Sequence, residues 1–142
     1  GGVYSGNAVV MAAAEAVLDE ILDDTESIYK HLYTVSEQLV NGLDEIMTRL
    51  NVPHVVQNVG PMISLFLTDG KVDQFREYRD VREHGDFENY IQFQHQAQRL
   101  GVYFHPNQFE PMFLSTAHTH ADMATVLERV EYAARCTLLN SQ

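Results

Sequence analysis

The chain has 142 residues, the size of one globular domain or of one domain with a short appendage. With 45% hydrophobic and 20% charged residues, its composition excludes a disordered or collagen-like chain. Twenty acidic residues against nine basic ones give a net charge of −11. This charge repels a polyphosphate backbone, so we expect no nucleic acid partner.

The sequence contains one cysteine, Cys136, which cannot form a disulfide within the chain and which we expect to be packed rather than reactive. A single cysteine is typical of a reducing compartment or of a protein indifferent to oxidation, and we expect a cytoplasmic protein. No apolar run approaches the ~20 residues that span a bilayer, so we expect no membrane partner. Because the chain opens on a glycine-rich turn without Met or a signal peptide, we expect it to be part of a longer protein.

Two amphipathic helices are predicted at the start of the chain. Apolar residues at spacings of three and four predict a helix over residues 8–22, whose first turn Ser5 or Asn7 can cap. After an acidic interruption, the same spacing predicts a second helix over residues 27–50. Pro53 follows it and cannot continue a helix.

The hydrophobic period then changes to that of strands. Residues 54–59 and 62–67 are short β-branched or aromatic runs separated by Gly60-Pro61, which predicts two strands joined by a tight turn. Two further short strands are predicted at residues 102–104 and 112–115.

Three more helices are predicted in the second half. A charged stretch over residues 72–83 is compatible with a helix, and a further helix over residues 87–100 is followed by Gly101 in the position of a left-handed C-terminal cap. Thr119 and Asp122 form a capping box for a last helix. The resulting order predicts an α+β fold, in which helices cover one face of a small, mostly antiparallel sheet.

Seven histidines raise the possibility of a metal site. His118 and His120 offer two imidazoles, to which His105 or His95 would add a third. The pair lies just before a capped helix, with no cysteine partner and no second pair at ligand spacing, so we predict no metal site. The chain also lacks the Gly-x-Ser-x-Gly turn of serine hydrolases and the Gly-Lys-Ser/Thr loop of nucleoside triphosphatases.

The first candidate site is the glycine turn over residues 1–7. It presents backbone N–H groups and a serine hydroxyl at a helix N-terminus, where the free donors and the helix dipole favour a phosphate. The alternative is a helix entry whose glycines are purely structural.

The second candidate site is the proline-bracketed loop over residues 104–111. It holds an imidazole, an amide and a carboxylate, those of His105, Asn107 and Glu110, between aromatic residues. Loops held by rigid elements are common places for binding groups. The alternative is a connecting loop with Glu110 in water.

Several short motifs along the chain form one pattern: Tyr4-Ser5-Gly6-Asn7 with Met11-Ala12-Ala13, Gly60-Pro61-Met62 with Phe66 and Thr68-Asp69-Gly70, Gly101-Val102-Tyr103, Gln108-Phe109-Glu110, and Ala117-His118-Thr119. In this order, and over essentially the whole chain, they resemble the C-terminal third of class III pyridoxal-phosphate aminotransferases. The resemblance is greatest to the glutamate-1-semialdehyde 2,1-aminomutases. Several motifs in register make the pattern specific, although each alone is weak.

The resemblance implies a fold-type I enzyme that binds pyridoxal phosphate and works as a cytoplasmic homodimer on a small amino acid or amino aldehyde. Residues 1–26 would be the end of the large cofactor domain with its junction helix. Residues 27–142 would be the small C-terminal domain, which closes over the substrate.

The resemblance also implies roles for individual residues. The segment from Gly2 to Ser5 would approach the cofactor phosphate of the neighbouring subunit, and because Val3 replaces the family's usual threonine, the Val3 N–H or Ser5 would make the contact. Glu110 corresponds to the loop glutamate that faces the active site of the aminomutases, and it is the predicted catalytic residue. No arginine lies between Arg99 and Arg129, which favours an aminomutase-like site over a typical ω-aminotransferase site.

The chemistry of this family needs a lysine that forms a Schiff base with the cofactor. The only lysines are Lys30 and Lys71, and neither lies in a context like that of the family's lysine. We therefore expect a fragment that is inactive alone. The alternative function is a free-standing acidic α+β binding module without catalysis.

Overall fold

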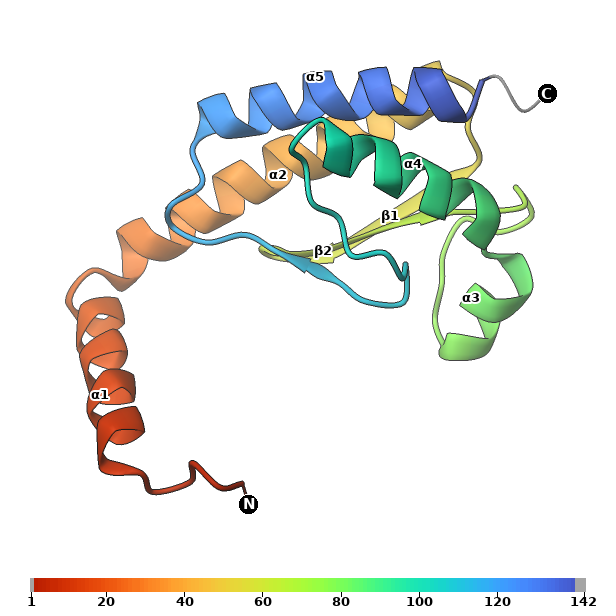
Figure 1. Ribbon diagram of the computed structural model, residues 1–142. Helices are drawn as coiled ribbons and strands as arrows, with labels where there is room; N and C mark the ends of the chain where they lie inside the picture. The colour runs from red at the N-terminus through yellow and green to blue at the C-terminus, as the bar shows by residue number, and fades with distance from the viewer. Residues whose placement is uncertain (1, 140–142) are drawn as a thin grey trace. The chain divides into compact units, whose positions relative to one another are not determined.

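The computed structural model describes residues 2–139 (Figure 1). In chain order, its elements are α1 (Ala8–Asp23), α2 (Thr25–Arg49), β1 (His54–Val59), β2 (Met62–Leu67), α3 (Tyr78–His84), α4 (Phe87–Arg99), β3 (Met112–Phe113) and α5 (His120–Thr137). Helices combined with a small antiparallel sheet confirm the predicted α+β class.

The chain divides into two compact units, residues 1–31 and residues 32–142. Gly1 and residues 140–142 lie outside the described residues. The predicted division into residues 1–26 and 27–142 refers to a junction with a larger domain, and it stays a prediction.

The first unit contains a turn that leads into α1 and, after α1, the first residues of α2. The side chain of Asn7 caps this helix, because its Oδ1 accepts hydrogen bonds from the N–H groups of Val9 and Val10 at 3.0 and 3.2 Å. Ser5, the other predicted cap, instead accepts a hydrogen bond from the Gly2 N–H at 3.1 Å. Asn7 therefore starts the helix, and Ser5 closes the turn before it.

The sheet of the second unit has the strand order β1-β2-β3, and both pairs are antiparallel. The predicted hairpin is confirmed: Val59 pairs with Met62 across a turn in which Gly60 has a φ of 55°. Met62 pairs in turn with Phe113 of β3. Successive side chains of a strand point to opposite faces, so this register determines to which face of the sheet each residue of β2 points.

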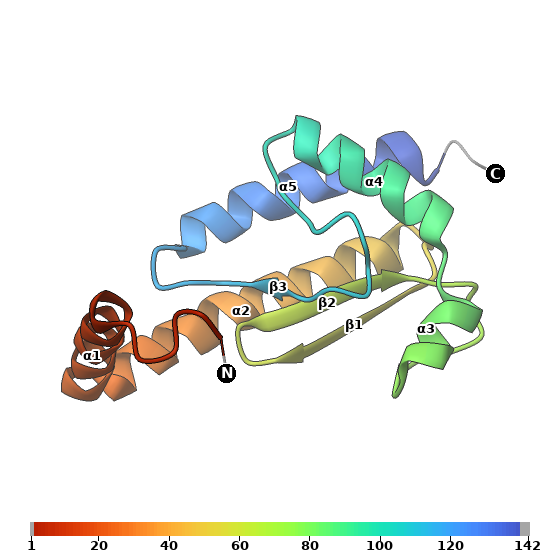
Figure 2. The ribbon, with the colours of Figure 1, turned by 60° about the horizontal axis from the view of Figure 1, so that its bottom comes forward.

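Helices α2, α4 and α5 cover the first face of the sheet (Figures 1 and 2). Ile63, Leu65 and Leu67 of β2 point to this side and are almost completely buried. The helices contribute side chains to the same core. Those that are almost completely buried include Val35, Leu43, Met47, Phe93, Ala97, Met123, Val130 and Ala134.

The second face of the sheet has a smaller core of its own. Val55 of β1 and Phe66 of β2, which are register partners, pack with Phe75 and with Val81 of α3. The rings of Phe66 and Phe75 meet edge to face with centroids 4.8 Å apart. This core holds the segment before α3 against the sheet.

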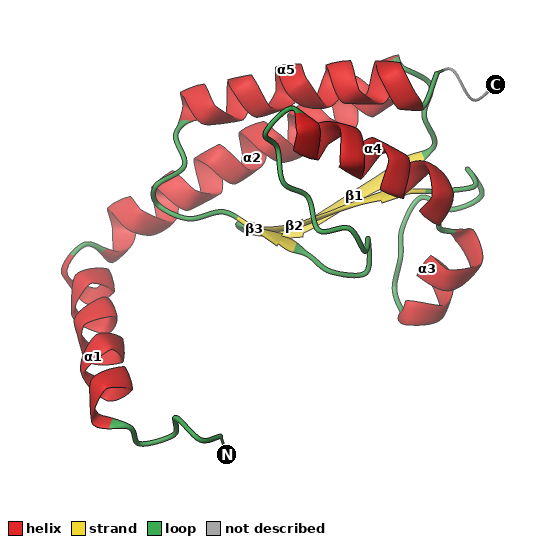
Figure 3. Cartoon of the chain, in the orientation of Figure 1, coloured by secondary structure: helices red, strands yellow, loops and turns green. Residues whose placement is uncertain are grey.

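One predicted strand is wrong. Residues 102–104 form a loop in Figure 3, although Val102 and Phe104 are buried as the apolar pattern suggested. Side chains of α4 provide the hydrogen bonds that a neighbouring strand would have provided: Gln94 Nε2 donates to the Phe104 carbonyl at 2.8 Å, and the Tyr90 hydroxyl donates to the His105 carbonyl at 2.9 Å. The backbone partners of this segment are thus side chains, which hydrophobic periodicity does not reveal.

Two other elements are shorter than predicted. The strand expected at residues 112–115 contains only Met112 and Phe113. The helix expected over residues 72–83 begins at Tyr78, because Gln57 of β1 binds the Phe75 backbone through two hydrogen bonds. The Nε2 atom of Gln57 donates to the Phe75 carbonyl at 3.0 Å, and the Oε1 atom of Gln57 accepts from the Phe75 N–H at 2.8 Å.

The remaining boundaries agree with the sequence. Gly101 has a φ of 82°, the left-handed conformation expected after α4. Thr119 and Asp122 form the predicted capping box of α5.

Cys136 is exposed, so the prediction that it is packed is wrong. Within residues 2–139, no helix has the length and hydropathy needed to cross a membrane.

Helix α1 buries none of its residues, although its apolar side chains are numerous. Exposed apolar surface of this kind promotes association. We expect the 142-residue chain to form dimers or larger oligomers, and Met11→Glu with Leu18→Glu to shift it toward monomer in sedimentation equilibrium. The matched control, Ala13→Glu with Ala16→Glu, adds the same charge on the opposite side of the helix and should leave association unchanged. A monomer at all concentrations would contradict this prediction.

Candidate functional site

The turn before α1 contains the three predicted phosphate-binding residues, Gly2, Val3 and Ser5. It is closed by two hydrogen bonds, from the Ser5 N–H to the Gly2 carbonyl at 3.0 Å and from the Asn7 N–H to the Tyr4 carbonyl at 3.0 Å. Val3 is 96% exposed. Among the described residues, no partner is seen for the N–H groups of Val3 and Tyr4.

This geometry fits a phosphate group. Backbone N–H donors at a helix N-terminus bind anions without a positively charged side chain. The Ser5 hydroxyl accepts from the Gly2 N–H and keeps its own proton for donation. Val3 can contribute its N–H and no side-chain bond, so the turn offers a cradle made mainly of backbone donors.

The predicted catalytic residue, Glu110, lies in the second unit, on an exposed bend between α4 and β3. Its N–H donates to the Asn107 carbonyl at 3.1 Å, which closes a turn over residues 107–110. Within this turn, the Asn107 side chain accepts a hydrogen bond from the Phe109 N–H at 3.1 Å. The exposed carboxylate therefore extends from a turn with internal hydrogen bonds.

Two residues of this turn attach it to the rest of the unit. Gln108 is 1% exposed and accepts a hydrogen bond from the N–H of Leu67, the last residue of β2, at 3.1 Å. The ring of Phe109 stacks on Tyr78 with centroids 4.7 Å apart and lies 5.3 Å from the ring of Phe87. The residues that flank Glu110 thus connect it to β2, α3 and α4.

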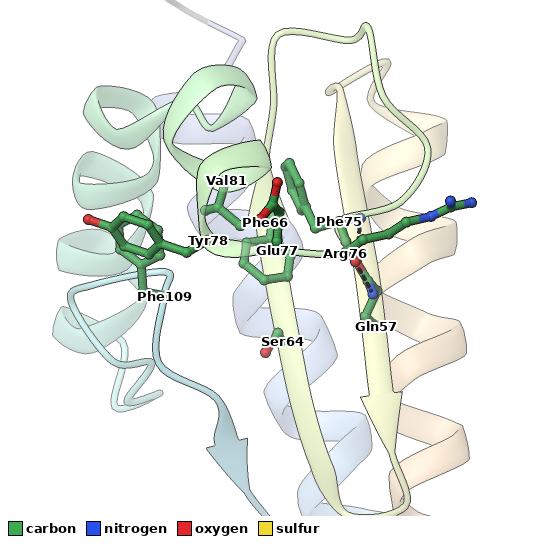
Figure 4. Close-up of a pocket in the computed structure, with 9 residues that line it drawn as sticks. All are labelled: Gln57, Ser64, Phe66, Phe75, Arg76, Glu77, Tyr78, Val81 and Phe109. Atoms are coloured by element: carbon green, nitrogen blue, oxygen red, sulfur yellow. Dashed lines mark hydrogen bonds between the residues drawn. The ribbon is translucent and has the colours of Figure 1, made fainter.

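A pocket of about 380 Å³ lies beside this turn, on the second face of the sheet (Figure 4). Gln57 and Ser64, which are register partners, line it from the sheet. Tyr78 and Phe109 form one wall together, and Arg76 and Glu77 add charge from the segment before α3. A volume of this size suits a small organic molecule.

The two lysines do not fit a covalent cofactor site. Lys71 donates from its Nζ to Asp69 Oδ2 at 2.9 Å, and this hydrogen bond lowers the pKa of the Asp69 carboxyl to about 2. The same contact raises the pKa of Lys71, which keeps the amine protonated and unable to attack a carbonyl group. Lys30 is exposed on α2.

The histidines predicted as non-ligands are engaged in other contacts. His120 Nδ1 lies 2.6 Å from Gln38 Oε1, and His118 Nδ1 lies 3.0 Å from the Ser115 nitrogen. Within residues 2–139, no cluster of three or more histidine, cysteine or acidic side chains is arranged to hold a metal ion.

The predicted site residues therefore fall in both units, with Gly2, Val3 and Ser5 in the first and Glu110 in the second. Sequence patterns did not identify Gln108, Tyr78 and Phe87 as the anchors of the Glu110 turn. Gln108 follows Asn107 in a loop without a hydrophobic period, so no local signal marked it as buried, and stacking between distant aromatic residues leaves no local pattern either.

The sequence of the chain is similar to curated aminomutases. It is 36% identical over 127 residues to a glutamate-1-semialdehyde 2,1-aminomutase of Thermus thermophilus, a match that covers 89% of this chain and 29% of that protein. The aminomutase of Desulfitobacterium hafniense is 38% identical over 130 residues, covering 90% and 28%. The chain thus spans about three tenths of the length of these relatives. No protein-family model matches it.

Solved structures show the same fold. An (S)-enantioselective ω-transaminase from Thermomicrobium roseum superimposes with a TM-score of 0.68 at 21% identity, covering 97% of this chain and 29% of that one. The FumI protein of Sphingopyxis sp. MTA144, solved in its pyridoxal-phosphate internal aldimine form, gives 0.66 at 24% identity, covering 84% and 25%.

The chain corresponds to the C-terminal portion of a class III pyridoxal-phosphate aminotransferase. This confirms the resemblance carried by the sequence motifs. Within this aminotransferase portion, the Glu110 turn is held by side-chain contacts from the helices as well as from the sheet.

A hydrogen bond from α4 to the loop that follows it makes the stability of the aminotransferase portion depend on pH. Burial raises the pKa of Tyr90, whose hydroxyl donates to the His105 carbonyl, to about 12. The pKa of an unfolded tyrosine is ~10. Below pH ~10 both states keep the proton, but between pH ~10 and 12 only the unfolded state loses it, so stability falls as the pH rises.

We expect Tyr90→Phe to remove this fall and to lower the free energy of unfolding by about 1 kcal/mol near pH 8, because the His105 carbonyl loses its donor. Urea unfolding at pH 8 and pH 11 measures both effects. Tyr132→Phe, at an exposed position of α5, is the control and should retain the wild-type dependence. The same fall in Tyr90→Phe would show that other groups cause it.

Proposed function

We propose that this chain is the C-terminal part of an enzyme that transfers an amino group with pyridoxal phosphate, in the manner of the glutamate-1-semialdehyde 2,1-aminomutases. The observation that carries the proposal is the 36% identity over 127 residues to an aminomutase. The matched region includes most of this chain, and the fold agrees with that of transaminases. Amino-group transfer is therefore favoured over a free-standing binding module.

In this proposal, the turn from Gly2 to Ser5 holds the cofactor phosphate. Its exposed backbone donors support the role, and the assembly is a homodimer in which the turn serves the neighbouring subunit. When bound, pyridoxal phosphate accepts and returns an amino group and withdraws electrons from the reacting carbon. The lysine that binds it covalently would come from outside these 142 residues.

Glu110 would hold or transfer a proton at the substrate amine. An exposed carboxylate on a turn that is anchored to rigid elements is suited to this role. The substrate would be a small amino acid or amino aldehyde. The absence of arginine between Arg99 and Arg129 supports an aminomutase-like site, because arginine is the usual partner of a substrate carboxylate.

The proposal is tested by expressing the complete reading frame that contains this chain in the cytoplasm, where we expect the enzyme to work. A purified protein with an absorption band at roughly 400–430 nm supports a bound cofactor. Conversion of glutamate 1-semialdehyde to the isomer in which the amino group has moved to the neighbouring carbon identifies an aminomutase. A colourless protein that neither binds pyridoxal phosphate nor transfers amino groups would instead support the binding module.

The 142-residue chain alone should not bind pyridoxal phosphate covalently at one site, since Lys71 is paired with Asp69 and Lys30 is exposed on a helix. We expect borohydride reduction in the presence of the cofactor to give only scattered, substoichiometric labelling in mass spectrometry, and no transaminase activity. One-to-one labelling of either lysine, accompanied by turnover, would refute the interpretation as a fragment.

In the complete protein, we expect Glu110→Gln to lower kcat/KM by ~10²-fold or more, because the loss of a group that transfers a proton has effects of this size. The free energy of unfolding should change by less than ~1 kcal/mol, since Glu110 is exposed. Glu83→Gln, also at an exposed position, is the matched control and should retain full activity. Equal activity of the two variants would show that Glu110 is a solvent-exposed loop carboxylate without a catalytic role.

A further inference from the structure

Gln108 is a buried polar residue whose role the fold alone does not explain. Its side chain is 1% exposed, and only its Oε1 has a hydrogen-bond partner, the Leu67 N–H at 3.1 Å. Within residues 2–139, its Nε2 has none. Burying an amide with half of its hydrogen-bonding capacity unused is costly, and an apolar side chain of similar size would avoid this cost.

The one hydrogen bond of Gln108 is made at an edge of the sheet. The Thr68 N–H donates toward β1, to the Pro53 carbonyl at 3.0 Å. Because successive N–H groups of a strand point to opposite edges, the Leu67 N–H points away from β1. On that side, β3 pairs with Met62 and Ile63, and the Asp86 N–H of the α3–α4 junction donates to the Leu67 carbonyl at 2.8 Å. The Leu67 N–H lies between these contacts and donates to the Gln108 side chain instead of to a strand.

The fold also leaves space for this side chain. A Cβ atom on Gly85, between α3 and α4, would lie 2.8 Å from Gln108 Nε2 and 2.5 Å from the Val81 carbonyl oxygen. Gly85 has a φ of −75°, which any residue can adopt, so space rather than backbone conformation favours glycine there. The α3–α4 junction thus accommodates the amide of Gln108.

Gln108 is two residues before Glu110 and within the same turn. The Glu110 N–H donates to the carbonyl of Asn107, the residue before Gln108, so a shift of Gln108 is transmitted to Glu110 through two peptide units and this hydrogen bond. The Tyr78 and Phe87 rings hold Phe109 from another side, but ring contacts allow sliding, whereas a buried hydrogen bond fixes a distance. The carboxylate position therefore depends on the bond from Leu67 to Gln108.

We propose that Gln108 is the positioning residue for Glu110, acting by anchoring the turn over residues 107–110 to the edge of β2. The catalytic part of this inference rests on the proposed function, whereas the anchoring part does not. A residue that acts through another should lose its effect when the other is removed, and this separates positioning from general stabilisation.

The test uses the complete protein with Gln108→Met, Glu110→Gln and both changes together. We expect Gln108→Met to lower kcat/KM by about 10-fold or more, mainly through kcat, and the double variant to be no worse than Glu110→Gln alone. Gln94→Met is the matched control. Gln94 is equally buried but bonds to the Phe104 carbonyl, and its loss should lower kcat/KM by less than about 3-fold.

Gln108→Glu provides the conservative rescue. It keeps an acceptor at the same place, and burial favours its neutral form at pH 6. We expect its kcat/KM at this pH to be within about 3-fold of wild type. Additive effects in the double variant, an equal loss in Gln94→Met, or no rescue by Gln108→Glu would each overturn the positioning role.

Hydrogen exchange tests the anchoring without any activity. In the wild-type protein, the Leu67 amide should be as protected as the other buried amides of β2, and this measurement remains decisive if Gln108→Met does not fold. In Gln108→Met, the amides of Leu67 and Glu110 should exchange at least about 10-fold faster. An unprotected Leu67 amide in the wild type would overturn the anchoring. If the protein binds no cofactor but Leu67 is protected, the proposed function fails while the anchoring stands.

Discussion

The second unit depends on the burial of β2 on both faces. Ile63, Leu65 and Leu67 enter the helical core on one side, while Phe66 packs with Phe75 and Val81 on the other. A slip of one residue in the hairpin would exchange these two sets, moving large apolar side chains to positions of the wrong size. The Val59–Met62 turn therefore determines the register, and every element that packs on the sheet inherits its position from that register.

The candidate site uses what this central strand leaves unpaired. β3 pairs with only the first two residues of β2, and the α3–α4 junction pairs with its end, where Thr68 bridges to Gly85 and the Asp86 N–H donates to the Leu67 carbonyl at 2.8 Å. The Leu67 N–H lies between these two contacts. Open edges are usually covered or blocked, and here a side chain from the loop after α4 bonds to the strand at Leu67. The loop is thereby attached to the most deeply buried strand without becoming a strand itself. This attachment gives an exposed carboxylate a defined position.

The elements that the sequence predicted well are those whose pattern is local. The α5 capping box, the β1–β2 hairpin and the left-handed Gly101 each depend on residues that are close together in the chain. The failures, at residues 72–77 and 102–104, share a different cause. In both, a glutamine side chain of another element bonds to the backbone of the segment, Gln57 for the first segment and Gln94 for the second.

The same distinction applies to the candidate site. Glu110 and the glycine turn were predicted because short motifs resemble those of a known family, whereas the residues that hold Glu110 were not predicted. Gln108 bonds to Leu67, 41 residues earlier in the chain, and Phe109 stacks on Tyr78, so neither contact leaves a local pattern. Motifs therefore predicted where the chemistry of this chain lies, and only the fold showed which residues hold the Glu110 turn.

The strong negative charge of the chain opposes the proposed phosphate contact. A phosphate is repelled by a net charge of −11, and the first 31 residues contain one basic residue, Lys30, against six acidic ones.

Two features reduce this repulsion at the turn. No acidic residue lies in the first turn of α1, where one would compete with an external anion for the helix dipole. The nearest acidic residue along the helix, Glu15, is seven positions beyond Ala8 and thus about 10 Å away, close to one Debye length at physiological salt. The backbone N–H donors of the turn act at short range and can therefore bind a phosphate although the negative charge of the chain repels it at long range. The same negative charge attracts a substrate that carries a cationic amine.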